Sequence, residues 1–505
     1  MKAAQAVGID LGTTFSAIAI FDEEGRARAI PNAEGTLTTP SIVIWHNDAF
    51  LVGQPALDLV QRAQGPERDR QAAALIRAVK RMIGNPPVGG LISNGHRTSP
   101  AEVSAAVLAK LARDASAHLG FKVQDAVITV PAHFGDRERS ATKAAAELAG
   151  LRVLRMMNEP SAAALVYSID KQATPGTVLV FDLGGGTFDA TILQLEEKES
   201  RVLATQGIEE LGGINFTKAL ADFLALRYVS QTKTPYPQDS LSLERLISEA
   251  EAAKCQLSES LTATVSLVSS AGQAATLTIT REQFEDIIDL FSYQLQTAVE
   301  MALEQAKKTP TDIGRVLLCG GSSRIPAIQT MLANLFGRPP EQILDLDLSV
   351  ALGAAYAAYN LEQAEAKSRQ KPELAGLQTM SAGLIIDCVS YPVGIAVLNQ
   401  RGDDFTKLVM LQTGDPLDTW SQPYTVRIVG TATEFPPISI YKGAGTRLDP
   451  ADYLGEIALT LPPNTPTGAR ATIRMLQDQN GLIQVQLTVD GKELPGHLQR
   501  AAILQ

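Results

Sequence analysis

The sequence is poor in the residues and runs that mark several large classes of protein. Its 505 residues include only three cysteines, Cys255, Cys319 and Cys388, and these lie too far apart for a disulfide framework or a zinc site. No apolar run approaches the roughly 20 residues that a membrane-spanning helix needs. No signal peptide precedes the first apolar run, which begins close to Met1. We therefore expect a protein of the reducing cytoplasm that has no membrane partner.

Positive charge is also scarce. The chain has 44 Lys and Arg against 55 Asp and Glu, which gives a net charge of −11. Contacts to nucleic-acid phosphates need clustered Lys and Arg, so nucleic acid is excluded as the main partner. The 45% hydrophobic content is that of an ordinary globular protein. At this length we expect three or four domain-sized units.

The glycine-rich stretch Val180–Ala190 is the most informative part of the chain. Gly184–Gly186 lie between two runs of β-branched and aromatic residues, a pattern that predicts a β-hairpin with a tight turn. Such a turn leaves backbone N–H groups bare, and bare N–H groups form a nest for phosphate oxygens. Asp182 and Asp189 flank the turn and are suited to hold a divalent cation, and Thr187 adds a hydroxyl.

The same pattern occurs once more near the N-terminus, in Val7–Ala17. Asp-Leu-Gly, then Thr-Phe, then Ala recur in the same order, with one extra residue in the second copy. Either turn alone could be an ordinary hairpin. Two matched copies, with Asp10 and Asp182 each entering a turn, favour a duplicated domain that clamps a nucleotide between its halves.

The organisation of the chain changes after Asn360. Strands alternate with helices before it, which predicts α/β layers, and we expect mostly helix from Leu51 to about Met82. The pattern becomes all β from about Ala382, and Asn480-Gly481 between two apolar runs predicts a hairpin. The expected units are a nucleotide-binding domain over 1–360, a linker over 361–382, a β-sandwich over 383–495 and a short tail over 496–505, with no helical bundle after the sandwich.

Several further residues would converge on a nucleotide if the two halves face each other. Lys80 can neutralise phosphate charge or orient the attacking water, and Glu159, just before a proline, can position that water or accept its proton. Gly320-Gly321-Ser322 is expected to open a helix and suits a nucleoside or phosphate edge. Glu251 and Lys254, on one face of a predicted helix, could close over the base. Phosphoryl transfer needs mainly such positioning and charge stabilisation.

These residues resemble those of a known family. Val7–Ser16, Asn158–Ala164, Phe181–Asp189, Leu211–Gly213 and Gly320–Pro326 are similar to motifs of the seventy-kilodalton heat-shock chaperones of the DnaK type. The resemblance spans about 5–360 and continues more weakly through 383–490. It implies an α/β actin-like (ribonuclease H-like duplicated) two-lobe ATPase domain, followed by an all-β sandwich that binds substrate peptides.

The resemblance also implies roles for individual residues. The magnesium-side acids would be Asp10, Asp182 and Asp189, and the catalytic residues would be Lys80, Glu159, Asp182 and Thr187. Phosphates would be held by Gly12, Thr13, Thr14, Gly184, Gly185, Gly186, Thr187, Gly212 and Gly213. Adenosine would be contacted by Glu251, Lys254, Ser258, Gly320, Gly321, Ser322, Arg324 and Asp347. The interdomain switch and co-chaperone contact would involve Pro131, Arg139, Arg155 and Asp387.

The sequence departs from the family pattern at several places. The segment 85–98 is much shorter than the family's subdomain there. Cys255 and Gln256 follow Lys254, and the guanidinium that can stack on adenine in the family is absent. His133 replaces a usual aromatic hydroxyl. The interdomain segment 383–388 keeps its apolar run and Asp387 but lacks the acidic lead-in. The helical lid over the peptide groove is missing.

Plainer interpretations exist for some of these residues. Lys80 alone would be a solvated helix charge, and Glu159 before a proline could be only a helix cap. Glu251 and Lys254 could form a surface ion pair, and His133 could be an ordinary packed side chain. Leu398 and Ile438 fall near groove positions of the family, but core packing explains them equally well.

The expected function is that of a monomeric, ATP-driven, lidless chaperone that binds unfolded or extended peptide segments, with ATP/ADP and Mg²⁺ as cofactors. A J-type co-chaperone and a nucleotide-exchange factor are the partners that the resemblance implies. An alternative is a nucleotide-gated interaction protein with little turnover that docks one dedicated partner. A small-molecule kinase or a filament-forming actin relative on the same fold also stays open.

Overall fold

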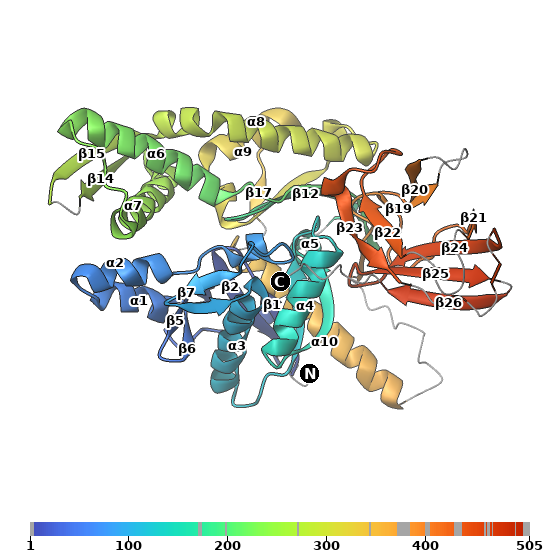
Figure 1. Cartoon of the computed structure of the whole chain (residues 1–505). Coiled ribbons are helices and arrows are strands. Elements are labelled where there is room, and N and C mark those ends of the chain that lie inside the picture. Colours follow the sequence, from blue (N-terminus) through green and yellow to red (C-terminus); the bar gives the residue numbers. More distant parts are fainter. Residues whose placement is uncertain are drawn as a thin grey trace.

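The structure is a computed structural model, and it describes most of the chain. The described residues are 5–169, 174–196, 199–269, 272–342, 345–370, 384–398, 404–428, 437–458, 461, 465–466, 468–489 and 491–497. Figure 1 shows two α/β lobes, one above the other, with a β domain beside them.

The first lobe is built on a six-stranded sheet that contains the N-terminal hairpin. Its strands run in the order β10 (Arg152–Asn158), β9 (Asp125–Val130), β1 (Val7–Asp10), β2 (Phe15–Phe21) and β3 (Ala27–Ala29), with β4 (Thr38–Pro40) beside β2. β1 pairs antiparallel with β2 and parallel with β9. Its helices are α3 (Pro100–Leu119), α4 (Asp136–Leu148), α5 (Glu159–Ile169) and α10 (Ser349–Gln370).

The second lobe repeats this pairing around the second hairpin. Its strands run in the order β17 (Glu341–Gln342), β16 (Arg315–Cys319), β11 (Gly176–Leu183), β12 (Phe188–Leu195), β13 (Glu199–Ile208) and β18 (Leu384–Ile386). β11 pairs antiparallel with β12 and parallel with β16, as β1 does with β2 and β9. Both expected hairpins are therefore present, each with the same neighbours in its own sheet. The covering helices are α6 (Gly213–Thr232), α8 (Arg281–Gln305) and α9 (Pro326–Phe336).

Smaller elements extend both lobes at the end away from the β domain (Figure 1). In the first lobe these are β5 (Val43–His46), β6 (Ala49–Val52), α1 (Gln54–Arg62), α2 (Gly65–Ala74), the 3₁₀ turn η1 (Val79–Met82), β7 (Leu91–Ser93) and β8 (His96–Thr98). In the second they are α7 (Ser240–Glu259), β14 (Thr262–Val268) and β15 (Ala274–Thr280). Helix thus covers most of 51–82, as expected, but in three separate pieces, and Gly53, Gly65 and Ala78, where these pieces begin, each have a left-handed φ.

Two small-residue helices, α5 and α10, join the lobes at their base. A Cβ on Gly8 in β1 would lie 2.0 Å from the backbone nitrogen of Ala355, and one on Gly353 would lie 1.9 Å from the carbonyl oxygen of Ala162. Only glycine lets backbones approach so closely. The alanine-rich composition of both helices therefore serves tight packing where the two sheets meet.

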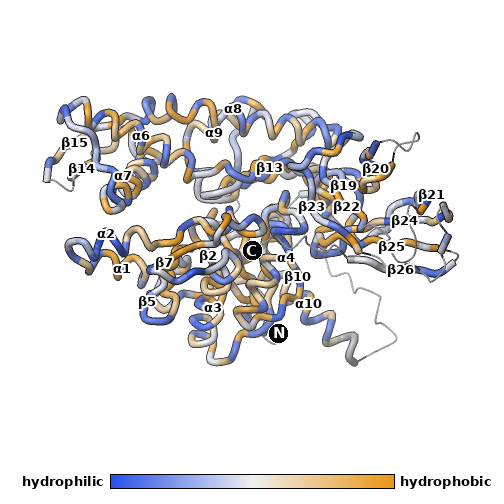
Figure 2. The backbone as a smooth tube through the Cα atoms, viewed as in Figure 1, coloured by the Kyte–Doolittle hydropathy of each residue, from blue (hydrophilic) through white to orange (hydrophobic). Residues whose placement is uncertain are grey.

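The apolar side chains follow the expected pattern of an α/β fold. The largest buried cluster lies in the second lobe, where side chains of β11 and β12 pack against α6 and α8. Along α8 the hydropathy alternates between hydrophilic and hydrophobic (Figure 2), as expected for a helix with one buried face. Among the described residues, none of the helices combines the length and the apolar character needed to cross a membrane.

The β domain consists of two four-stranded sheets that enclose their own core. One sheet has the order β20 (Phe405–Leu411), β19 (Val393–Leu398), β22 (Ile438–Lys442) and β23 (Tyr453–Ile457). The other has the order β21 (Tyr424–Arg427), β24 (Arg470–Gln477), β25 (Ile483–Val489) and β26 (Lys492–His497). The expected hairpin at Asn480-Gly481 joins β24 to β25, and alternate residues of β25 are buried.

The segment between the two α/β lobes and the β domain is only partly described. α10 continues to Gln370, so the first part of the expected linker is helical, and residues 371–383 lie outside the described residues. β18 then pairs in parallel with the edge strand β13 of the second lobe. The chain just before the β domain is therefore held on the lobe by main-chain pairing.

Candidate active site

The turns of the two hairpins lie against each other between the lobes. A Cβ on Gly185 would lie 1.9 Å from Oγ1 of Thr14, and one on Gly186 would lie 2.4 Å from Oγ1 of Thr13. Turn residues of the second lobe thus touch turn residues of the first. Some of the N–H groups expected to be bare are already used, since the N–H of Gly184 donates to the carbonyl oxygen of Thr187 at 3.1 Å.

Carboxylates gather beneath these turns. Asp10 ends β1, Asp182 lies near the end of β11, and Glu159 begins α5; Asp182 and Glu159 are buried. Burial, together with the charge of Glu159, raises the pKa of Asp10 to about 7. Burial also raises the pKa of Asp182 well above its usual range, and the charges of Glu159, Asp189 and Asp10 add to this effect. Asp10 and Asp182 therefore share one site, as the duplicated hairpin predicts.

Lys80 supplies positive charge to this group. It lies on η1, is 5% exposed, and forms an ion pair with Glu159. Burial alone would lower the pKa of Lys80, but the charges of Glu159 and Asp10 outweigh it and raise the pKa. One lysine among several buried carboxyls leaves negative charge to be neutralised, and buried charges are tolerated only when paired or bound to metal. Carboxylate oxygens beside the glycine turns are the donor type that fits Mg²⁺, although no three Asp, Glu, His or Cys side chains of the described residues are placed to hold a metal ion together.

Two of the residues expected at the base end, Lys254 of α7 and Ser322 of the 3₁₀ turn Gly321–Arg324, meet at the start of α6. Lys254 on α7 donates to Oγ1 of Thr217 at 3.0 Å and forms an ion pair with Glu251 at 2.8 Å. A Cβ on Gly213 would lie 3.0 Å from Nζ of Lys254 and 2.5 Å from Oγ of Ser322, so both side chains lie against Gly213. Ser258 instead bonds back to the carbonyl oxygen of Lys254 at 3.4 Å.

The remaining base-end residues come from the second lobe's last loops. Arg324 and Asp347 form an ion pair at 3.0 Å, and Asp347 lies beside Gly321. Gly320 has a left-handed φ of 75° and lies against Leu183 and Asp182, so that this turn borders the second hairpin directly. The segment Gly321–Arg324 is a 3₁₀ turn, and α9 begins only at Pro326, so the motif precedes the helix it was expected to open.

Two contributions to the site were missed from the sequence. Arg81, next to Lys80, donates to the carbonyl oxygen of Gly186 at 2.9 Å. His133, for which ordinary packing was the plain interpretation, lies with Nδ1 2.7 Å from Oδ1 of Asp189. Burial lowers the pKa of His133, but the charge of Asp189 outweighs this and leaves the pKa raised. Gly207 makes room for this pair, since its Cβ would lie 2.3 Å from Nδ1 of His133.

Comparison with known proteins identifies the family. A family model described as Hsp70 protein matches residues 6–493. The chaperone protein DnaK of Thermotoga petrophila is 36% identical over 488 residues, covering 95% of this chain and 77% of the relative. The chaperone protein DnaK of Deinococcus radiodurans is 37% identical over 512 residues, with the same coverage. This chain belongs to the Hsp70 family.

Membership of the Hsp70 family settles the general activity. The chain is an ATP-binding, ATP-hydrolysing heat-shock chaperone that acts in protein folding, with actin-like ATPase lobes and a β sandwich. Hsp70 proteins generally bind ATP or ADP together with Mg²⁺, which agrees with the fit of the carboxylate site.

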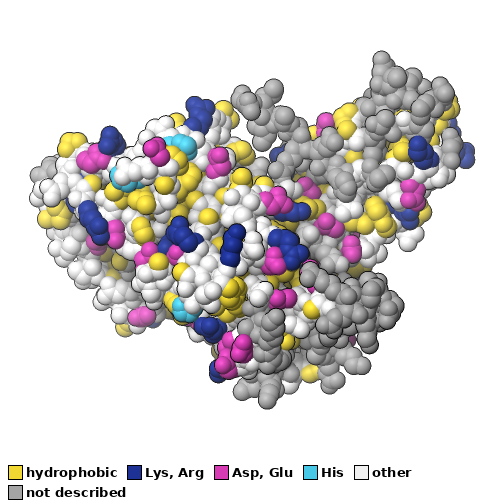
Figure 3. All heavy atoms as spheres, turned by 90° about the horizontal axis from the view of Figure 1, so that it is seen from below, with side chains coloured by type: hydrophobic (Ala, Val, Ile, Leu, Met, Phe, Trp, Pro, Cys, Tyr) yellow, Lys and Arg dark blue, Asp and Glu magenta, His cyan; other side chains and the backbone are white. Residues whose placement is uncertain are grey.

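On the face seen in Figure 3, Lys and Arg lie beside Asp and Glu rather than in one basic patch.

In this Hsp70 chain the β domain docks on the first lobe beside the acid cluster. Arg139 of α4 donates to the carbonyl oxygen of Asn480 at 3.2 Å, and the side chain of Asn480 accepts from the N–H of Met156 at 2.9 Å. Asp136 accepts from the N–H of Ile483 at 3.0 Å. Of the residues expected at an interdomain switch, Arg139 thus lies at the interface.

The other expected switch residues lie near the same contact. Asp387, just after β18, is buried, accepts from the hydroxyl of Ser161, and lies 3.9 Å from Arg155. Pro131 begins the short turn that carries Ala132 and His133, and its carbonyl oxygen accepts from the N–H of Phe134 at 3.1 Å. The structure therefore places Arg139 at the boundary with the β domain, Arg155 beside Asp387, and Pro131 at the start of the neighbouring turn.

The two expected peptide-binding residues lie on neighbouring strands of one sheet. Leu398 ends β19 opposite Phe405, and Ile438 begins β22 opposite Ile457. Both are half-buried, and residues 399–403, just after β19, and 429–436, shortly before β22, lie outside the described residues. Whether they bind peptide therefore stays a prediction.

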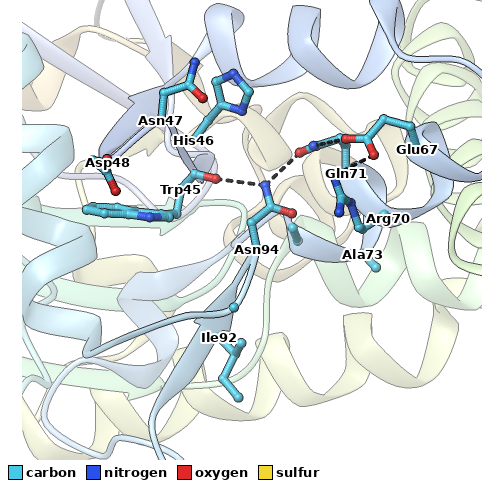
Figure 4. Close-up of a pocket in the computed structure, with 12 residues that line it drawn as sticks. Trp45, His46, Asn47, Asp48, Glu67, Arg70, Gln71, Ala73, Ile92 and Asn94 are labelled. Carbon is cyan, nitrogen blue, oxygen red and sulfur yellow. Dashed lines mark hydrogen bonds and ion pairs between the residues drawn. The ribbon is translucent and has the colours of Figure 1, made fainter.

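An open groove of about 840 Å³ lies apart from this site, in the outer part of the first lobe. It runs between the turn after β5, the helix α2 and the β7–β8 turn (Figure 4). Several of its polar groups bond to one another: Asn94 donates to the carbonyl oxygen of Trp45 and to Gln71, both at 2.8 Å, and Arg70 pairs with Glu67 at 2.6 Å. None of the residues expected to bind nucleotide lines this groove.

The contact between the two turns yields a testable prediction. In Gly186→Ala the new Cβ would lie 2.4–2.8 Å from three side-chain atoms of Thr13, so the turns must move apart. We expect the affinity for Mg·ATP to fall by about tenfold or more, the equivalent of roughly 1.4 kcal/mol. Isothermal titration calorimetry measures this loss.

Gly184→Ala is the matched control in the same turn. Its Cβ would meet only the carbonyl oxygen of Thr187, at an ordinary 3.7 Å. The loss of affinity should therefore be clearly smaller than in Gly186→Ala. Equal losses in the two variants would mean that contact between the turns does not govern nucleotide binding.

Proposed function

We propose that this chain is a chaperone in which ATP binding and hydrolysis in residues 1–360 control the affinity of residues 383–495 for extended apolar peptide segments. The observation that carries this proposal is the position of the Ala132 peptide. Its N–H donates to Oδ2 of Asp189 at 3.1 Å, and its carbonyl oxygen accepts from Ser390 Oγ of the β domain at 2.7 Å. A single residue thus separates a magnesium-side acid from the substrate domain.

The proposed roles in the ATPase follow from the geometry. Asp10, Asp182 and Asp189 hold the cation, and the turns at Gly12–Thr14 and Gly184–Thr187 hold the phosphates. When bound, Mg²⁺ withdraws charge from the phosphates. Lys80 neutralises charge that develops on the transferred group or orients the attacking water, and Glu159 positions that water or takes its proton.

The nucleoside is held at the start of α6. Gly212 and Gly213 let the start of α6 pack directly on the glycine turn, because their positions leave no room for a side chain, and their backbone is the proposed contact to the nucleotide. The α7 side chains Glu251, Lys254 and Ser258 close over the adenosine from one side, and the loop side chains Ser322, Arg324 and Asp347 close from the other. Lys254 and Glu251 keep each other oriented through their ion pair.

Coupling requires that nucleotide state change how Ala132 and its neighbours meet the β domain. A shift of Asp189 on binding or losing the γ-phosphate would move the N–H of Ala132, and with it the acceptor of Ser390. By linkage, peptide bound to the β domain then biases the nucleotide site in return. A J-type co-chaperone and a nucleotide-exchange factor are the proposed partners of this cycle, and the chain acts as a monomer in the cytoplasm.

Turnover of ATP with and without an unfolded peptide tests this proposal. We expect peptide to stimulate steady-state hydrolysis several-fold in the native sequence. Ser390→Ala should reduce this stimulation, because it removes the hydrogen bond to Ala132 while leaving the cleft intact. Peptide without effect on hydrolysis would contradict coupling and favour a nucleotide-gated docking protein.

The β domain is proposed to bind peptide without a helical lid. In the described part of the chain, the elements after α10 are strands and the 3₁₀ turn Pro450–Asp452. Peptide would then be held by main-chain hydrogen bonds and by pockets near Leu398 and Ile438. We expect release of a fluorescent peptide within seconds in both the ATP and the ADP state, measured by stopped-flow anisotropy. Release over many minutes from the ADP state would refute the proposal.

A further inference from the structure

Arg81 bridges the two lobes at the phosphate turn. It lies on η1 in the first lobe, and both of its acceptors lie in the second. Nε donates to the carbonyl oxygen of Gly186 at 2.9 Å, and an Nη donates to Oδ1 of Asn215 at 2.6 Å. Hydrogen bonds from a charged donor are stronger than neutral ones. This guanidinium therefore ties the turn of the second hairpin to the segment that carries Lys80.

The two acceptors belong to one rigid unit. Oδ1 of Asn215 also accepts from the N–H of Gly212 at 3.1 Å, which caps the start of α6. The N–H groups of Gly213 and Ile214 in turn donate to the carbonyl oxygens of Gly184 and Gly185, at 3.0 and 2.8 Å. The phosphate turn and the first turn of α6 are thus bonded together, and Arg81 binds both.

The first-lobe side of the bridge is short and constrained. Arg81 directly follows Lys80, and its N–H donates to the carbonyl oxygen of Ala78 at 3.0 Å. Ala78 has a left-handed φ of 51°, which few residues other than glycine adopt, so the surrounding structure fixes this turn. A movement of Arg81 must therefore move Lys80, which pairs with Glu159.

We propose that Arg81 is a positioning residue, which sets Lys80 against the bound phosphates by locking η1 to the second hairpin and which thereby also slows nucleotide release. The proposal rests on the nucleotide site proposed above. It assigns Arg81 two separable effects: one on the chemical step, through Lys80 and the phosphate turn, and one on the opening of the lobes.

A second arginine provides a matched comparison. Arg77, four residues earlier, also crosses between the lobes and forms an ion pair with Glu244 on α7. Close by, the N–H of Leu241 donates to Asp69 at 2.9 Å. These contacts lie at the outer end of the lobes and involve α7 rather than the phosphate turn. Arg77 should therefore affect opening but not the positioning of Lys80.

The experiment measures two rates for each variant. Single-turnover hydrolysis of Mg·ATP reports the chemical step, and release of ADP that carries a methylanthraniloyl group reports opening. We expect Arg81→Ala, which removes both charged hydrogen bonds, to slow hydrolysis by about tenfold or more and to speed release. Arg77→Ala should speed release with hydrolysis within about twofold of the native rate.

Asn215 gives a variant that strengthens the same bridge. In Asn215→Asp the hydrogen bond to Arg81 becomes an ion pair, and the carboxylate can still accept from Gly212, so release of the labelled ADP should slow several-fold. Arg81→Lys should restore only part of the hydrolysis rate, because an ammonium group cannot reproduce the fork of a guanidinium. Recovery of the native hydrolysis rate in Arg81→Lys would show that the positive charge at this position acts alone, without the fork of the guanidinium.

The outcomes separate the inference from the proposal on which it rests. If Arg81→Ala and Arg77→Ala change both rates in the same proportion, or if Asn215→Asp speeds release, Arg81 has no positioning role. If the native chain binds no labelled ADP, the nucleotide site itself is wrong. Should Arg81→Ala fail to fold, the Asn215→Asp variant still decides the question.

Discussion

Replacing Lys80 with alanine is expected to lower ATP hydrolysis by about a hundred- to a thousandfold, the usual effect of removing a preorganised charge from an active site. Lys80 is buried, pairs with Glu159, and favours the ionised forms of Asp10 and Asp182. Without it the buried carboxyls repel one another, and no side chain at this position can neutralise the transferred phosphoryl group. Single-turnover hydrolysis of Mg·ATP measures the loss.

Lys110 offers a control for the general cost of removing a buried lysine. It is 4% exposed and pairs with Asp114 at 2.7 Å and Glu34 at 2.9 Å, on the outer side of the first lobe. Lys110→Ala should lower stability, as losing one partner of a buried pair does, while hydrolysis per folded molecule stays near the native rate. Equal losses of hydrolysis in the two variants would assign Lys80 a structural role only.

The Lys80→Ala variant also distinguishes a chaperone driven by hydrolysis from a nucleotide-gated switch. If hydrolysis drives the cycle, Lys80→Ala should bind Mg·ATP but lose assistance to protein refolding. If nucleotide binding alone sets the state of the β domain, refolding assistance should persist. Nucleotide affinity and refolding activity should be measured in one preparation of Lys80→Ala. A retained affinity shows that the nucleotide site is still formed, and the refolding activity then tells the hydrolysis-driven chaperone from the switch.

The local sequence predicted the features that depend on neighbouring residues. The order Asp-Leu-Gly, then Thr-Phe, then Ala predicted both hairpins, because a tight turn between β-branched runs is determined within about ten residues. The duplication then predicted that Asp10 and Asp182 meet, and they do act on each other. The alternation of Ile483, Val485 and Leu487 likewise predicted one buried face of the β domain.

What the sequence could not predict are contacts that form only when the parts of the fold come together. Arg81 reaches Gly186 across 105 residues of chain, and no local pattern distinguishes it from a solvated arginine beside the proposed catalytic lysine. His133 meets Asp189 only because Gly207 leaves space for its ring. The signal that could have found Arg81 is its position next to Lys80, on a segment already placed at the cleft.

The helix expected over most of 51–82 is confirmed, but the breaks between α1, α2 and η1 were not predicted. Each piece begins at a residue with left-handed φ, namely Gly53, Gly65 and Ala78. The break at Ala78 is the one with functional meaning. It turns Lys80 inward to Glu159 on a short 3₁₀ turn, whereas a continuous helix would carry Lys80 along a straight axis.

Replacing Arg139 with alanine is expected to abolish most of the coupling between ATP and peptide. Arg139 is 5% exposed, and its guanidinium donates to Phe134 at 2.8 Å, to Asn158 at 2.6 Å and to Asn480 of the β domain at 3.2 Å. Asn158 immediately precedes Glu159. One side chain thus joins the β domain to the residue beside a proposed catalytic carboxylate.

Loss of this side chain leaves several buried acceptors unpaired, at a cost of about 1–3 kcal/mol for each one that water cannot reach. The docked arrangement should lose more than either domain alone, because the carbonyl oxygen of Asn480 loses its donor only where the domains meet. We therefore expect peptide stimulation of hydrolysis to fall by about tenfold, and ATP to change peptide affinity far less than in the native chain. Steady-state hydrolysis with peptide measures the stimulation, and anisotropy of a labelled peptide with and without ATP measures the change in peptide affinity.

Arg137→Ala is the appropriate control, since Arg137 also reaches the β domain from α4. It donates to the carbonyl oxygen of Leu454 at 2.9 Å and lies 5.7 Å from the ring of Tyr453, so its loss should weaken docking at the β23 side of the interface. If docking strength alone mattered, the two variants would reduce coupling alike. A much larger loss in Arg139→Ala is expected, because only Arg139 also holds Asn158 beside Glu159. If Arg139→Ala retains coupling, the connection between the nucleotide site and the β domain must run through other residues. The Ala132–Ser390 contact would then be the next to test.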